Sequence, residues 1–89
     1  MIRWFVHHRV RDYAAWRKVY DGFAGVQEAG GVRAEAVFRS VDDPNDVTVV
    51  HDFDDVETAK AFVASPALRE AMMRAGVEGE PELFLGEEV

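Results

Sequence analysis

The order in which two hydrophobic periodicities alternate along the chain limits its fold more than any other feature. Strand-like segments rich in β-branched and aromatic residues cover residues 2–10, about 32–41, 46–53 and about 81–87. Helix-like segments with apolar residues three and four apart cover 13 to about 29 and a region from 56 that is interrupted at Ser65-Pro66 and closed by Gly76. The order strand, helix, strand, strand, helix, strand predicts an α+β, ferredoxin-like βαββαβ fold, a four-stranded antiparallel sheet with its helices on one face.

Local signals predict how these elements begin and connect. Asp12 is expected to cap the first helix, because its carboxylate can accept free amide protons of the first turn. Asp54, followed three residues later by Glu57, predicts a capping box for the second helical region. Turn-favouring residues at 42–45 join the middle strands as a hairpin, and Pro81 favours an edge position for the last strand.

Size and composition restrict the partners. The 89 residues predict a single domain over 1–89 whose own core is marginal. With 10 basic and 17 acidic residues the net charge is −7, so neither nucleic acid nor an anionic membrane is expected as a partner. The absence of cysteine excludes disulfides and Cys-ligated zinc and makes the cytoplasm the expected location. The polar first residues do not resemble a signal peptide or a membrane span.

Apolar residues occupy both alternating sets of positions on the expected strands. Trp4 and Val6 alternate with Phe5 on the first strand, and Val49 alternates with Val50 on the third. A sheet that is apolar on both faces needs cover on both faces. The helices cover one face, and we expect a second copy of the chain to cover the other; a monomer with an amphipathic outer face is the alternative. Residues expected at the rim of that interface are Arg3, Arg33, Arg39 and Glu35.

Three stretches resemble the dimeric α/β-barrel proteins of the antibiotic biosynthesis monooxygenase-like superfamily, and more closely its small cyclase-like bacterial members, most of them uncharacterised. They are HHRVRDYAAWRKVYD, VFRSVDDPNDVTVVHDFD and FVASPALREAMMRAGVEGEPELFLGEEV. The most specific parts are HxVxDYxxW, from His8 to Trp16, and SPxLxxAMxxAGV, from Ser65 to Val77. The resemblance implies a ferredoxin-like protomer, a homodimer with sheets packed face to face as a dimeric α/β barrel, and a cavity between helices and sheet.

Three histidines are candidates for proton transfer, because a neutral imidazole can accept a proton near pH 7 and return it. His8 ends the first strand and matches the histidine of HxVxDYxxW, which implies a place in the cavity. The first and third strands are expected to lie adjacent and parallel, so that His51 shares one end of the sheet with a histidine of the first strand. Alternation puts His7 and His8 on opposite faces, so only one of them can face His51. A structural hydrogen-bonding role is the alternative for each.

Aromatic side chains can line an apolar cavity suited to a flat ligand, and the candidates are Trp4, Tyr13, Trp16, Tyr20 and Phe84. The hydroxyls of Tyr13 and Tyr20 can orient a ligand oxygen or take part in proton transfer. The alternative is that the rings fill the core, as aromatic residues at helical spacing usually do.

Two classes of function fit these features. The first is a cofactor-independent monooxygenase or cyclase that acts on an aromatic or polyketide-like substrate, with His8 or His51 shuttling a proton and oxygen reacting with a substrate carbanion. The second is a non-catalytic module that binds a small hydrophobic ligand or only assembles. No phosphate-binding loop and no HxH or HxxxH spacing is present, so neither a cofactor nor a metal is expected. Haem binding and degradation is a third interpretation, which the superfamily's membership suggests.

Overall fold

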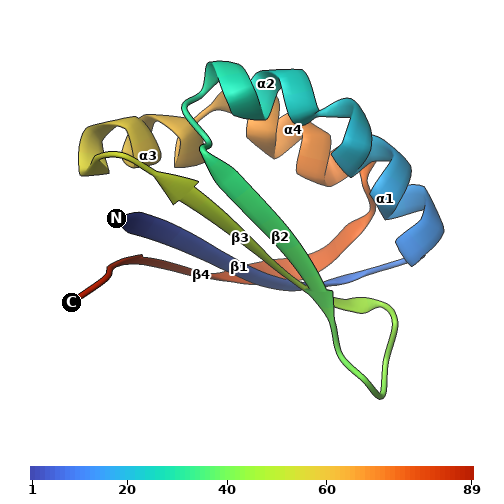
Figure 1. The fold of residues 1–89 in the computed structure, drawn as a ribbon. Coiled ribbons are helices and arrows are strands. Elements are labelled where there is room, and N and C mark those ends of the chain that lie inside the picture. The colour runs from blue at the N-terminus through green and yellow to red at the C-terminus, as the bar shows by residue number, and fades with distance from the viewer.

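A computed structural model describes all residues, 1–89, and shows one sheet with every helix on the same side (Figure 1). The elements follow in the order β1 (Ile2–Val10), α1 (Tyr13–Gly22), α2 (Ala24–Ala29), β2 (Ala34–Arg39), β3 (Asp46–Phe53), α3 (Val56–Val63), α4 (Pro66–Arg74) and β4 (Val77–Glu87). The predicted ferredoxin-like α+β fold is confirmed. None of the helices combines the length and the apolar character that crossing a bilayer requires.

The sheet has the strand order β2-β3-β1-β4, and each neighbouring pair is antiparallel. The expectation that the first and third strands lie parallel was therefore wrong. The helical crossover returns β2 in the direction of β1, and the β2–β3 hairpin then reverses the chain, so β3 must oppose β1. The last strand lies at an edge, as Pro81 indicated, although it begins four residues before the proline.

Alternation along the two central strands divides the sheet into an inner face under the helices and an outer face. On β1 the even-numbered residues from Ile2 to Val10 are buried, and on β3 the odd-numbered residues from Val47 to Phe53 are buried. These residues pack against α1, α3 and α4 through Trp16, Phe62 and Leu68, among others. The two histidines of the inner set, His8 and His51, are the polar members of this otherwise apolar surface.

The predicted helix over 13–29 is two helices, with a break at Phe23. The amide of Phe23 donates to the carbonyl oxygen of Tyr20 at 3.0 Å, a tighter turn than the α-helical one, which lets the chain change direction. Gly22 and Gly25 flank the break, and glycine lowers the stability of a helix interior. The aromatic stripe of residues three and four apart, Tyr13, Trp16, Tyr20 and Phe23, therefore ends at the break itself.

The predicted cap of the second helical region was wrong by one residue. Asp55, not Asp54, caps α3, since its Oδ1 accepts a hydrogen bond from the Thr58 amide at 2.8 Å. Asp54 instead accepts a hydrogen bond from Arg33 Nε at 2.9 Å and ties the start of α3 to the segment before β2. The cap by Asp12 is confirmed, because its carboxylate accepts the Ala15 amide of α1.

Candidate functional site

A pocket of about 50 Å³ lies between the inner face of the sheet and the helices α1, α2 and α4. Its wall is mainly apolar and includes aliphatic residues of α1, β1, β3 and α4. The polar groups that face it are His8 of β1, Tyr20 of α1, Gln27 of α2 and His51 of β3. This arrangement, an apolar cavity with a few convergent polar groups, is typical of a small-molecule site.

The structure brings together five of the seven residues selected from the sequence. Trp4, His8, Trp16, Tyr20 and His51 all line the pocket. Tyr13 lies beside the pocket rather than in its wall. The Tyr13 ring stacks on that of Trp16, with centroids 5.7 Å apart, and the Arg39 guanidinium lies over the Tyr13 ring, 4.3 Å from its centroid.

Phe84 does not lie in the pocket. It is on the outer face of the sheet, 64% exposed, and its ring packs against that of Phe5 at a centroid distance of 5.8 Å. The expectation that it lines the same cavity as Trp16 was wrong, because the register pairs Phe84 with Phe5, whose side chain points away from the helices.

His8 and His51 face the same pocket, although not for the reason expected. Because β1 and β3 are antiparallel, His51 is aligned with Trp4, and His8 is aligned with Val47 four residues further along β1. The two positions are therefore about 13 Å apart along the strand. Aromatic rings bridge this distance, since Trp16 lies 5.9 Å from the His8 ring and 4.9 Å from Tyr20, which stacks on His51 at 6.2 Å.

Both pocket histidines are uncharged near pH 7. Burial, which penalises the charged form, and then the nearby His7 lower the pKa of His8 to about 4. Burial likewise lowers the pKa of His51 to about 4. Neither ring nitrogen of His8 has a hydrogen-bond partner in the protein, and the same is true of His51 Nδ1 and Gln27 Nε2. Buried polar atoms are normally paired, so their convergence on one pocket points to a ligand with hydrogen-bonding groups.

Tyr20 connects His51 to a carboxylate at the surface. Its hydroxyl donates a hydrogen bond to Glu35 of β2, and its oxygen lies 3.3 Å from His51 Nε2. Burial raises the pKa of Tyr20, and the hydrogen bond to Glu35 raises it further, so the phenol is not ionised near pH 7. Glu35 was expected at the rim of an interface, but its side chain turns towards the helix side and meets Tyr20.

Sequence reasoning missed two polar residues of the site, and only Gln27 left a signal in the sequence. Gln27 stands four residues after Phe23 and so continues the aromatic stripe with a polar side chain. Glu35 is aligned with His51 in the β2–β3 hairpin, so the two share the inner face of the sheet. The hairpin register, which the sequence did not define, was needed to find it.

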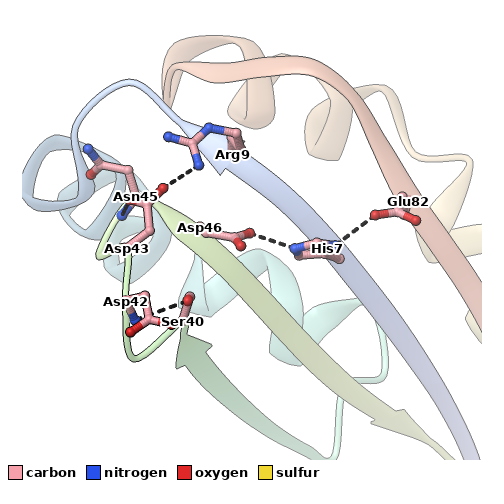
Figure 2. Close-up of polar contacts among 8 residues, drawn as sticks. All are labelled: His7, Arg9, Ser40, Asp42, Asp43, Asn45, Asp46 and Glu82. Carbon is pink, nitrogen blue, oxygen red and sulfur yellow. Dashed lines mark hydrogen bonds and ion pairs between the residues drawn. The ribbon is translucent and has the colours of Figure 1, made fainter.

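His7 lies on the outer face, opposite to His8 as alternation predicted, and is held between two carboxylates (Figure 2). Its Nδ1 is 2.8 Å from Glu82 Oε1, and its Nε2 is 2.5 Å from Asp46 Oδ1. The hydrogen bond to Glu82, and then that to Asp46, raises the pKa of His7. The three histidines therefore do not converge on one point, and Asp52, next to His51, is paired with Arg3 at 2.6 Å.

No family model and no curated protein matches this sequence. Solved structures do match over nearly the whole chain. A Bordetella bronchiseptica structure, provisionally described as an antibiotic biosynthesis monooxygenase, has a TM-score of 0.83 and 18% identity, covering 99% of this chain and 96% of that one. A Caulobacter crescentus structure with the same provisional description has a TM-score of 0.81 and 17% identity, covering 99% and 89%.

SnoaB of Streptomyces nogalater, described as a cofactor-independent oxygenase, has a TM-score of 0.77 and 16% identity, covering 99% of this chain and 94% of that one. At these identities the similarity concerns the fold. The chain thus has the fold of the antibiotic biosynthesis monooxygenase-like proteins, as the resemblance in the sequence implied.

Proposed function

We propose that this protein binds a small aromatic or polyketide-like molecule in the pocket and removes a proton from it, as a cofactor-independent monooxygenase. The observation that carries this proposal is the set of uncharged, unpartnered imidazole nitrogens inside an apolar cavity. A base of this kind accepts a proton from an activated C–H or O–H group. The similarity in fold to SnoaB supports the oxygenase chemistry.

The reaction converts a CH₂ group between activating aromatic or carbonyl groups into a ketone, R₂CH₂ + O₂ → R₂C=O + H₂O. The imidazole removes one proton, and the carbanion gives its electrons to O₂ and forms a C–O bond, which yields a peroxide anion. That anion takes the proton back. Loss of water then breaks the O–O bond and the second C–H bond and leaves the carbonyl. The carbon is oxidised and O₂ is reduced, so no other reductant is required.

A larger ligand needs more room than the pocket offers, since a cavity of about 150 Å³ encloses a benzene ring. A groove of about 320 Å³ between α4 and β4 adjoins the pocket and shares Trp4, Leu68 and Met72 with it. Ligand sites commonly measure about 300–1,000 Å³. We therefore place the reacting end of the substrate in the pocket and its remainder in the groove, with the flexible Met72 side chain displaced between them.

The test is oxygen uptake with anthrones, which carry such a CH₂ group, combined with mass analysis of the product. The expected product has gained one oxygen atom and lost two hydrogen atoms, with one O₂ consumed for each. His51→Phe and His8→Phe should reduce turnover by about 100-fold or more if the altered imidazole is the base. His7→Gln is the matched control, a histidine outside the pocket, provided that its oligomeric state equals that of the wild type. Equal turnover in all three variants would reject a histidine base.

Two alternatives give different results in the same assay. A cyclase uses the same base but forms its product without consuming oxygen. A non-catalytic module binds the ligand without forming any product. Addition of haem, followed by its Soret absorption, tests the haem interpretation. The cytoplasmic location stays a prediction from the sequence.

We further propose that the protein is a homodimer joined through the outer face of its sheet. An apolar row crosses this face where the register aligns Phe84, Phe5, Val50 and Ala36. Phe38 lies one row away and is 57% exposed. On either side of the apolar row the polar groups are already paired, Arg3 with Asp52 and His7 with Asp46 and Glu82. A second copy would bury the phenylalanines and leave few charges unpaired.

A further inference from the structure

His51, Tyr20 and Glu35 form an unbroken path from the pocket to solvent. His51 lines the pocket and is 3% exposed, whereas Glu35 lies on the surface of β2. Tyr20 lies between them, in contact with both through its single oxygen. Its ring plane is within 2° of that of His51, and the Trp16 ring also stacks on it, with centroids 4.9 Å apart. These two contacts hold the phenol in place.

The hydrogen-bonding capacity of these groups determines where each proton lies. The Tyr20 hydroxyl has one hydrogen, and it is donated to the Glu35 carboxylate, which can only accept. Tyr20 can therefore only accept at its contact with His51 Nε2. The neutral imidazole must then carry its hydrogen on Nε2, and Nδ1 keeps a free lone pair. This nitrogen is buried and has no partner in the protein.

We propose that Glu35, Tyr20 and His51 are a proton relay that makes His51 Nδ1 the base of the pocket and transfers the abstracted proton to the surface; its role in turnover rests on the proposed function above. Glu35 and Tyr20 act through His51 and are positioning residues. His8, whose two ring nitrogens have no such connection to solvent, binds the ligand instead.

The step balances without leaving a charge on the imidazole. As Nδ1 takes a proton from the substrate, the Nε2 proton of His51 passes to the Tyr20 oxygen, and the Tyr20 hydroxyl proton passes to Glu35. The substrate becomes an anion, Glu35 becomes neutral, and His51 and Tyr20 remain neutral. A proton left on His51 would be disfavoured, since burial opposes the imidazolium. The proton exchanges with water at Glu35 and returns along the same path to the peroxide.

The tautomer of His51 tests the relay without a substrate. Ring ¹H–¹⁵N spectra of the labelled full chain near pH 7 should show His51 with its proton on Nε2. Tyr20→Phe keeps the ring but removes the acceptor, so the chemical shift of the His51 Nε2–H proton should change. Glu35→Gln should keep the Nε2–H tautomer, since the amide oxygen still accepts from Tyr20. Tyr13→Phe, which removes the other tyrosine hydroxyl, is the control. A proton on Nδ1 in the wild type, or unchanged spectra in Tyr20→Phe, would overturn the relay.

Proton transfer is measured separately, as exchange of anthrone CH₂ hydrogens with D₂O under anaerobic conditions. We expect both Glu35→Gln and Tyr20→Phe to slow the protein-catalysed exchange by about tenfold or more, and Tyr13→Phe to leave it unchanged. Wild-type exchange in Glu35→Gln would reject the outer end of the relay. If neither the wild type nor any of the variants catalyses exchange or oxidation, the proposed function fails. The tautomer result still decides how His51 is held.

Discussion

The free energy of unfolding of the wild type should fall in weak acid. Replacing His8 by phenylalanine should remove about half of that fall. His8 is 6% exposed, and its pKa falls from about 6.5 in the unfolded chain to about 4 in the fold. Between these values the unfolded chain binds a proton that the folded chain does not. The contribution of His8 is therefore complete above about pH 6.5 and is lost as the pH falls towards 4.

The size of this effect follows from the two pKa values. From about pH 6.5 to about pH 5, such a shift lowers the free energy of unfolding by about 1–2 kcal/mol for one histidine. His51 has the same shift, so the wild type should lose about twice as much. That is a substantial part of the roughly 5–15 kcal/mol by which domains are stable. Phenylalanine retains the ring volume and cannot be protonated.

Urea unfolding followed by circular dichroism at both pH values measures the difference. His7 does not obscure it: its pKa is raised, so its contribution is present in acid and is lost only as the pH rises through its folded pKa. The carboxyl groups of Asp43, Asp52 and Asp55, whose pKa values are lowered, lose their contributions only below about pH 4. An equal loss in His8→Phe and wild type would refute the neutral, buried state of His8.

Three further predictions concern other parts of the molecule. Phe5→Asp should convert the proposed dimer to a monomer in light scattering, because it places a charge in the apolar row; an unchanged mass would reject the outer face as the interface. NMR titration should show His7 with a pKa above 6.5, the opposite of the pocket histidines. Gly31→Ala should lower the free energy of unfolding by more than about 1 kcal/mol, since Gly31 has φ +94° and an added Cβ would lie 2.4 Å from Thr58. Gly25→Ala, where a Cβ meets nothing within 4 Å, should be neutral or stabilising in the same urea assay.

Most of the fold could be predicted because each strand and helix carries its own hydrophobic period. The observed limits of β1 and β3 equal the predicted ones, and the interruption at Ser65-Pro66 separates α3 from α4 as expected. The break at Phe23 was not predicted, because the helical spacing of apolar residues continues through it from Val19 to Val26; the flanking Gly22 and Gly25 were the signal that marks it. The turn there depends on how the two helices pack on the sheet.

The candidate site was only partly predictable, because alternation tells which residues share a face but not which face the helices cover. It separated His7 from His8 correctly. It did not show that Phe84 shares a face with Phe5, since this depends on the register between β1 and β4, which shifts between His7 and Arg9. Glu35 was likewise recognisable only once the hairpin register aligned it with His51.

The central claim, that the pocket takes an aromatic ligand, is tested most directly by an anaerobic NMR titration with an anthrone. The two tryptophans of the chain, Trp4 and Trp16, both lie in the pocket wall, so their indole N–H signals report on it. We predict saturable shifts of both indoles together with the ring signals of His8 and His51. Shifts confined to the outer face around Phe5, or no shift at any soluble concentration of the anthrone, would contradict the account.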